Sequence, residues 1–115
     1  MVDNKQQIDI NGCQILLDQE GYLIDPKDWT TAIAEALAEQ EGRILDERHW
    51  AIITLVREFY ERYEMAPAMR PLVKLVRQTL GEEQGQSIYL MKLFPESPAR
   101  VVARLAGLPK PTNCL

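Results

Sequence analysis

The sequence predicts a single α+β domain, residues 1–115, in which a small N-terminal antiparallel β-meander or hairpin packs on an array of about five helices. Three features support this prediction. Residues 8–17 alternate apolar and polar side chains around an Asn-Gly pair, later segments repeat apolar residues at steps of three and four, and residues 107–115 carry two prolines that favour an extended arm. A chain of this length buries roughly two thirds of its unfolded surface, so no disulfide or metal is needed for stability.

The composition is that of a soluble globular protein, with 46% hydrophobic and 26% charged residues and no apolar run near the roughly 20 residues that span a bilayer. Residues 1–7 are polar, lack the apolar region of a signal peptide, and are expected to be disordered. These features predict a cytoplasmic protein without a membrane partner. Cys13 and Cys114 stand at opposite ends with no paired spacing, which predicts free thiols, no metal site and no cofactor.

Charge divides the chain into two unequal halves. Residues 1–64 carry six Lys or Arg against fourteen Asp or Glu, whereas residues 65–115 carry seven against three. An acidic partner surface, or RNA held by a partner, would be drawn to the basic half. Uneven charge is also common in small domains, so this feature alone leaves both interpretations open.

The first elements are predicted to be strands. Asn11-Gly12 tolerates the positive φ values of a two-residue hairpin turn and separates the runs 8–10 and 13–17. The turn cluster 18–21 leads into Tyr22-Leu23-Ile24, a candidate third strand. Three short strands cannot form a core alone, so helices are expected to cover one face of the sheet.

Two helices are predicted next. Asp25-Pro26 is typical of a helix start, and the apolar repeat from Trp29 to Ala38 predicts a helix that ends at Gly42. Asp46 is the candidate N-cap of the longest helix, whose wide apolar stripe predicts a central position in the fold. His49, the only histidine, lies in its first turn, where a packing or capping role is expected rather than a catalytic one.

Three further helices follow a break at residues 65–67. The first begins no earlier than about Ala68, because of Pro71, and ends at Gly81. A short helix is predicted from Ser87 to Phe94-Pro95, and a last one from Ser97-Pro98 to Gly107. The first of the three shows an aligned basic stripe formed by Arg70, Lys74 and Arg77.

The final stretch, residues 107–115, is predicted to be a mobile arm that carries a thiol. At about 3.1 Å per residue in a polyproline-like path, it would place the sulfur of Cys114 on the order of 25 Å from the last helix. A frayed, functionless end is the competing interpretation. Lys110, Arg100 and Arg104 are the cations expected to favour the thiolate, and the terminal carboxylate opposes them. A thiol without a base of its own suggests a carrier that a partner's active site completes.

Other chemistry finds little support in the sequence. It shows no metal-ligand cluster, no glycine-rich phosphate loop and no serine-histidine-acid set, which argues against conventional hydrolase or nucleotide chemistry. Helices joined by short turns and the basic stripe also permit a DNA-binding regulator of the helix-turn-helix kind. The sequence pI near 5 and the single small basic face argue against it.

The residues resemble one known family over essentially the whole chain after about residue 8. Leu93-Phe94-Pro95, Pro98-Ala99 and residues 106–111, followed by Cys114 in the penultimate position, are similar to the DsrC/TusE family of sulfur-relay proteins. The resemblance also covers a set of earlier positions: Glu20-Gly21-Tyr22-Leu23, Trp29, Glu41-Gly42, His49-Trp50, Arg57, Tyr60 and Ala66-Pro67-Ala68.

The resemblance implies a fold and a chemistry. The family fold is a small antiparallel sheet against a helical array, and the penultimate cysteine carries sulfur as a persulfide, a role that falls to Cys114. Family members that serve dissimilatory sulfite reductase have a second cysteine eleven positions earlier, where this chain has Ala103. The chain therefore resembles the single-cysteine TusE type, and Cys13 does not match the family's second cysteine.

The function that the resemblance implies is that of a sulfurtransferase acting with partner proteins. Sulfane sulfur would pass from a TusBCD donor complex to Cys114 and then to the tRNA 2-thiouridylase that modifies the wobble uridine. The alternative is a single-cysteine partner of dissimilatory sulfite reductase or of sulfur oxidation. The candidate partner-binding residues, which could equally be solvated, are Arg70, Lys74, Arg77, Arg100, Arg104 and Lys110.

Overall fold

The computed structural model describes residues 6–112 and contains a two-stranded antiparallel sheet and five α-helices. This confirms the predicted α+β class. In chain order the elements are β1 (Gln6–Ile10), β2 (Cys13–Leu17), the 3-10 helix η1 (Pro26–Asp28), α1 (Thr31–Gln40), α2 (Glu47–Tyr63), α3 (Met69–Leu80), α4 (Ser87–Leu93) and α5 (Pro98–Leu105).

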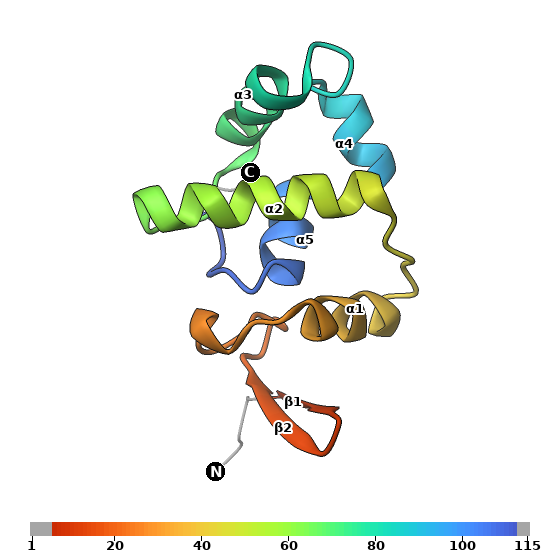
Figure 1. The fold of residues 1–115 in the computed structure, drawn as a ribbon, viewed down its shortest axis with the longest axis vertical. Helices are drawn as coiled ribbons and strands as arrows, with labels where there is room; N and C mark the ends of the chain where they lie inside the picture. The colour runs from red at the N-terminus through yellow and green to blue at the C-terminus, as the bar shows by residue number, and fades with distance from the viewer. Residues whose placement is uncertain (1–5, 113–115) are drawn as a thin grey trace.

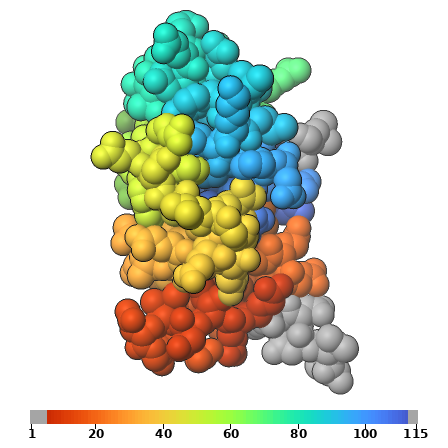
Figure 2. Space-filling model, turned by 90° about the vertical axis from the view of Figure 1, so that its right-hand side faces the viewer, coloured from red at the N-terminus to blue at the C-terminus, as the bar shows by residue number. Residues whose placement is uncertain are grey.

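The elements are stacked along the long axis of an elongated molecule measuring 46 × 27 × 24 Å. Figure 1 shows the hairpin at one end, then α1, then α2 with α5 beside it, and α3 and α4 at the other end. Figure 2 shows the same order as successive coloured bands, with the hairpin opposite the α3–α4 end. The basic second half of the sequence therefore supplies α3, α4 and α5, and the hairpin lies at the far end.

The hairpin forms as the Asn-Gly pair predicts. Asn11 and Gly12 have φ values of 50° and 88°, and Ile10 pairs with Cys13 beside the turn. β1 begins at Gln6, two residues before the expected start, because Gln6 pairs with Leu17 at the far end of the register. The strands bury one face, which carries Ile8 and Leu17, against α1; Cys13 is on the same face but is exposed because it lies beside the turn.

The prediction of a third strand is wrong. Residues 22–24 make one isolated bridge, between Leu17 and Leu23, and the N–H of Ile24 donates to the carbonyl of Leu16 over 3.2 Å. Pairing stops there because Pro26 has no N–H to donate and begins η1. Tyr22 and Leu23 are nevertheless buried and add to the core.

The helix expected from Pro26 is also divided. Pro26 begins only the short η1, and α1 starts five residues later, where the Thr30 hydroxyl accepts a hydrogen bond from the N–H of Ile33. Trp29 lies between them with φ −64° and ψ 138°, an extended conformation that no α-helix adopts. Thr30 was the missed signal, because threonine is a strong N-cap residue.

The other helix ends lie close to the predicted positions. Asp46 caps α2, and α3 starts after Ala68 and ends before Gly81, whose φ is 113°. α4 is preceded by Gln86, so Ser87 is its first residue rather than its cap. His49 has the expected capping role: its Nδ1 lies 3.1 Å from the N–H nitrogen of Asp46, and its Nε2 lies 3.0 Å from the carbonyl oxygen of Leu93.

The core runs through the middle of the stack, where α5 packs against α1, α2, α3 and α4. Phe94, just after α4, is fully buried, and its ring meets the His49 ring edge-on at a centroid distance of 5.2 Å. Ala103, where the resemblance implies a second cysteine in other family members, is 1% exposed. The C-terminal end of α5, where the arm begins, is thus held inside a well-packed region.

Candidate functional site

The structure shows the root of the C-terminal arm, from the last turn of α5 to Thr112. Cys114, the candidate sulfur carrier, lies outside the described residues. The described residues show how the start of the arm is held and where it leads as far as Thr112.

α5 ends in a Schellman motif. The N–H of Leu108 donates to the carbonyl of Ala103 over 2.9 Å, and the N–H of Gly107 donates to the carbonyl of Arg104 over 3.2 Å. Gly107 has a φ of 73°, as the residue at this position of the motif requires. A Cβ at Gly107 would also overlap the Cβ, Cγ and Cδ1 atoms of Trp29. Glycine is therefore needed here both for its conformation and for its size.

Two side chains bind the carbonyls that the end of α5 leaves unpaired. The indole Nε1–H of Trp29 donates to the carbonyl of Leu105 over 2.8 Å, and Arg57 donates to the carbonyl of Ala106 over 2.6 Å. The Arg57 guanidinium also lies 4.0 Å from the centroid of the Trp29 ring, in a cation–π contact. Burial lowers the pKa of Arg57, but an arginine remains charged at neutral pH. We call Trp29, Arg57 and Gly107 the arm anchor.

The sequence had pointed to these three residues only by resemblance and as helix or core positions. Trp29 was expected in an apolar stripe, and Arg57 had no predicted role. A signal was present, because Arg57 interrupts the wide apolar stripe of α2. Its partner is 49 positions away, a separation that no local pattern indicates.

Beyond the anchor, the described part of the arm lies against the body of the protein. Leu108 is 1% exposed and Pro111 is buried, while Lys110 Nζ forms an ion pair with Glu20 Oε2 at 3.0 Å. Figure 1 shows this segment turning back from α5 toward the connection between α2 and α3. The expected reach of about 25 Å applies to a fully extended path; residues 107–112 instead follow the surface.

The cations expected near the thiol are partly engaged elsewhere. Arg104 forms a bidentate pair with Glu41, with both N–O distances 2.8 Å, and Arg43 Nε binds the same carboxylate at 2.8 Å. Arg100 is exposed and lines the same surface hollow as Arg104. Lys110 is the member of this predicted set that lies on the arm itself, and it is paired with Glu20.

The structure also divides the predicted basic stripe of α3. Arg77 donates to the carbonyl of Gly85 over 3.1 Å and lies 3.8 Å from Glu82, so it holds the loop before α4. Arg70 and Lys74 are exposed and make no ion pair with any other residue among 6–112. Arg70 lines a cleft together with Thr112, the last described residue of the arm.

The described part of the chain offers neither a metal-binding cluster nor a helix that could span a membrane. Within residues 6–112, no three side chains of the His, Cys, Asp or Glu type form a group that could hold a metal ion. None of the helices there is both long and apolar enough to cross a bilayer. Cys13 is exposed on the hairpin, at the end of the molecule opposite α3 and α4.

The pair between Glu41 and the two arginines predicts a pH effect on stability. Partial burial by itself raises the pKa of the Glu41 carboxyl, but the hydrogen bonds and charges of Arg104 and Arg43 outweigh it, and the pKa lies below its usual value. The stabilisation is therefore present above the unfolded-state pKa of about 4.3 and is lost as the pH falls toward the folded-state pKa. In urea unfolding between pH 5 and pH 3, Glu41→Gln should lose less stability than the unchanged protein. Parallel pH profiles would contradict this assignment, and Glu35→Gln, an exposed position on α1, is the matched control.

Known proteins resemble this chain in sequence over nearly its whole length. The sequence model of the family described as DsrC-like protein matches residues 9–115. The sulfurtransferase TusE of Sodalis glossinidius is 48% identical over 108 residues, which are 94% of this chain and 100% of the relative. The sulfurtransferase TusE homolog of Haemophilus influenzae is 44% identical over 108 residues, 94% of this chain and 99% of that one.

Solved structures show the same fold. DsrC of Allochromatium vinosum matches with a TM-score of 0.89 and 47% identity, over 96% of this chain and 99% of that chain. The oxidised γ-subunit of dissimilatory sulfite reductase (DsrC) of Archaeoglobus fulgidus matches with a TM-score of 0.83 and 36% identity, over 96% of this chain and all of that one. The family resemblance seen in the sequence is confirmed: this chain belongs to the DsrC-like family.

Proposed function

We propose that this protein is a cytoplasmic sulfur carrier that holds sulfane sulfur as a persulfide on Cys114. It takes the sulfur from a TusBCD-like donor complex and delivers it to a tRNA 2-thiouridylase for wobble 2-thiouridine synthesis. The observation that supports this most directly is the near full-length similarity to relatives named sulfurtransferase TusE, within a family match that includes Cys114.

The chemistry requires a thiolate and no external oxidant. The Cys114 thiolate attacks the outer sulfur of a donor persulfide, a new S–S bond forms, and the donor cysteine leaves as a thiolate. The proton of the donor persulfide stays on the transferred sulfur or is exchanged with water. In the second step an acceptor thiolate attacks the outer sulfur of Cys114-S-SH, and Cys114 leaves as a thiolate. Each step moves one neutral sulfur atom, so Cys114 ends as the thiolate that it was at the start, the donor loses its sulfane sulfur and the acceptor gains it.

The arm anchor supports this role by giving the carrier a defined starting point. Trp29 and Arg57 bind both carbonyls at the end of α5, so the helix is held at the point where the proline-containing segment begins. A chain held at its root loses less conformational entropy when it enters a partner. Ala103 is buried in α5, and with alanine at this position the arm has no second thiol for an internal disulfide.

A persulfide transfer assay tests the proposal. After incubation with a sulfur-loaded donor complex, the intact protein should gain the mass of one sulfur atom at Cys114, and Cys114→Ser should gain none. Cys13→Ser is the matched control, because it removes the other cysteine and should leave the transfer unchanged. Transfer that persists in Cys114→Ser, or no transfer to the unchanged protein, would exclude the mechanism.

A second candidate function is supported by the structural match to the γ-subunit of a dissimilatory sulfite reductase. In that case the same fold would serve as a single-cysteine partner of sulfite reduction or sulfur oxidation. Affinity purification with Cys114 intact distinguishes the two, since recovery of a sulfite reductase in place of TusBCD-like subunits would favour the second.

A further inference from the structure

The described end of the arm identifies the surface near which sulfur must be exchanged. Thr112 lies in a cleft of about 810 Å³ between the end of α2 and the start of α3, together with Phe59, Met65 and residues 66–71. Cys114 is two residues further on, and two residues span at most about 7 Å between Cα atoms. A partner that reacts with its sulfur must therefore cover the surface around this cleft.

Contacts along residues 108–111 hold the arm against the protein before it reaches the cleft. Leu108 and Pro111 are buried, and Lys110 is paired with Glu20 on the turn after the hairpin. With the arm anchor behind them, these contacts direct the chain along one path toward the α2–α3 connection (Figure 1). Cys13, beside the turn of the hairpin, is not among the residues that line the cleft.

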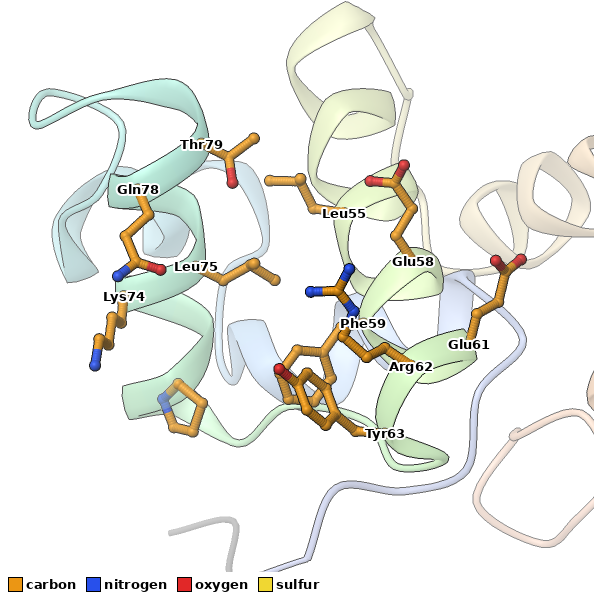
Figure 3. Close-up of a pocket in the computed structure, with 11 residues that line it drawn as sticks. Leu55, Glu58, Phe59, Glu61, Arg62, Tyr63, Lys74, Leu75, Gln78 and Thr79 are labelled. Carbon is orange, nitrogen blue, oxygen red and sulfur yellow. The ribbon is translucent and has the colours of Figure 1, made fainter.

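The surface beside the cleft combines apolar and basic side chains. Tyr63 and Met65 are 53% and 52% exposed, and they add apolar surface beside the cleft. A groove of about 790 Å³ continues from the cleft between α2 and α3, and Phe59 and Pro71 line both. Figure 3 shows Phe59, Arg62 and Tyr63 on the α2 side of this groove and Lys74, Leu75 and Gln78 on the α3 side.

The charges on the α3 side of the groove favour carboxylates on the partner. Arg62, Arg70 and Lys74 make no ion pair with any other residue among 6–112, whereas Arg104 and Lys110 are already paired with Glu41 and Glu20. Glu58 and Glu61 bring negative charge to the α2 side only, and α3 contains no acidic residue. Exposed cations without partners are available to pair with carboxylates across an interface.

We propose that the face formed by Phe59, Arg62, Tyr63, Met65, Arg70 and Lys74 is the docking face for the donor protein that passes sulfur to Cys114. The partner surface that fits it carries an apolar projection flanked by carboxylates. This inference rests on the proposed function and adds to it the site of contact. It also separates Arg70 and Lys74 from the other predicted partner-binding residues, Arg77, Arg100, Arg104 and Lys110, which lie outside this face.

Charge reversal on α3 tests the proposal. With the sulfur-loaded TusBCD complex as the probe, Arg70→Glu/Lys74→Glu should raise the KM for transfer to Cys114 by about tenfold or more and leave kcat within twofold. The difference should shrink at high salt, because exposed charges are screened. The matched control is Lys27→Glu/Lys92→Glu, which makes the same charge change at exposed positions on η1 and α4.

Two further measurements, of thiol reactivity and of tRNA binding, distinguish loss of docking from other causes of a raised KM. The reaction rate of Cys114 with a small aromatic disulfide should be equal in all the variants, which shows that the fold and the thiol are intact. An equal increase of KM in the test and control pairs, or none in either, would overturn the docking face. Loss of binding to tRNA alone, with transfer from the donor intact, would make the face an RNA contact and would equally overturn the proposal. If neither the unchanged protein nor any of the variants accepts sulfur, the proposed function itself fails.

Discussion

Replacing Gly107 with alanine is expected to lower the free energy of unfolding by about 2–5 kcal/mol. Two costs add up at this position. A left-handed φ of 73° costs a residue with a Cβ roughly 1–2 kcal/mol, and the new methyl group would overlap Trp29 near its own backbone, where the ring cannot swing away cheaply. The displaced indole would also lose its hydrogen bond to the carbonyl of Leu105.

The measurement is urea unfolding, with Gly42→Ala as the matched control. Gly42 has nearly the same φ, 71°, but no atom lies within 4 Å of the position that a Cβ would occupy. Its replacement should therefore cost only the conformational part, roughly 1–2 kcal/mol. Equal losses of unfolding free energy in the two variants would show that overlap with Trp29 contributes nothing to the cost of Gly107→Ala. Sulfur transfer to Cys114 should fall further than stability explains, because the direction of the arm changes.

Replacing Phe94 with alanine is expected to cost about 3–5 kcal/mol of unfolding free energy. The ring is fully buried, so its removal leaves a cavity as well as losing the free energy of burial. It also removes the edge-on contact with His49, whose imidazole joins the start of α2 to the carbonyl of Leu93. The loss should therefore loosen the packing of α4 on α2 and α5.

Phe94→Leu provides the comparison, because it keeps an apolar side chain in the site and should cost less than half as much. Unfolding by urea and amide hydrogen exchange in residues 87–93 would be measured together. A loss below about 1 kcal/mol in Phe94→Ala would mean that the surroundings collapse onto the cavity and that the ring is not a central packing element.

Local signals in the sequence predicted most of the fold. Asn11-Gly12, Asp46 and Gly81 mark their turn, cap and helix end correctly, because each acts through the conformation of its own backbone or of the next few residues. The wrong predictions arose where one local sequence pattern is compatible with two structures. Pro26 suits the start of a 3-10 turn as well as that of an α-helix, and Tyr22-Leu23-Ile24 is apolar because it is buried rather than because it pairs as a full strand.

Less of the candidate site could be predicted from local signals in the sequence. The arm and its cysteine stood out in the sequence, but the arm anchor joins Trp29 and Arg57 to carbonyls 76 and 49 positions away. Backbone carbonyls are present at every residue, so no side-chain pattern shows which of them will be left unpaired. Likewise, the stripe of Arg70, Lys74 and Arg77 is uniform in sequence, and only the loop packed on Arg77 separates its members.

The arm anchor has a consequence for biosynthesis. Its three residues come from the η1–α1 connection, from α2 and from the end of α5, so it cannot form until nearly the whole chain has left the ribosome and folded. A misfolded chain would carry the same thiol but would lack the contacts that hold the start of the arm along a fixed path.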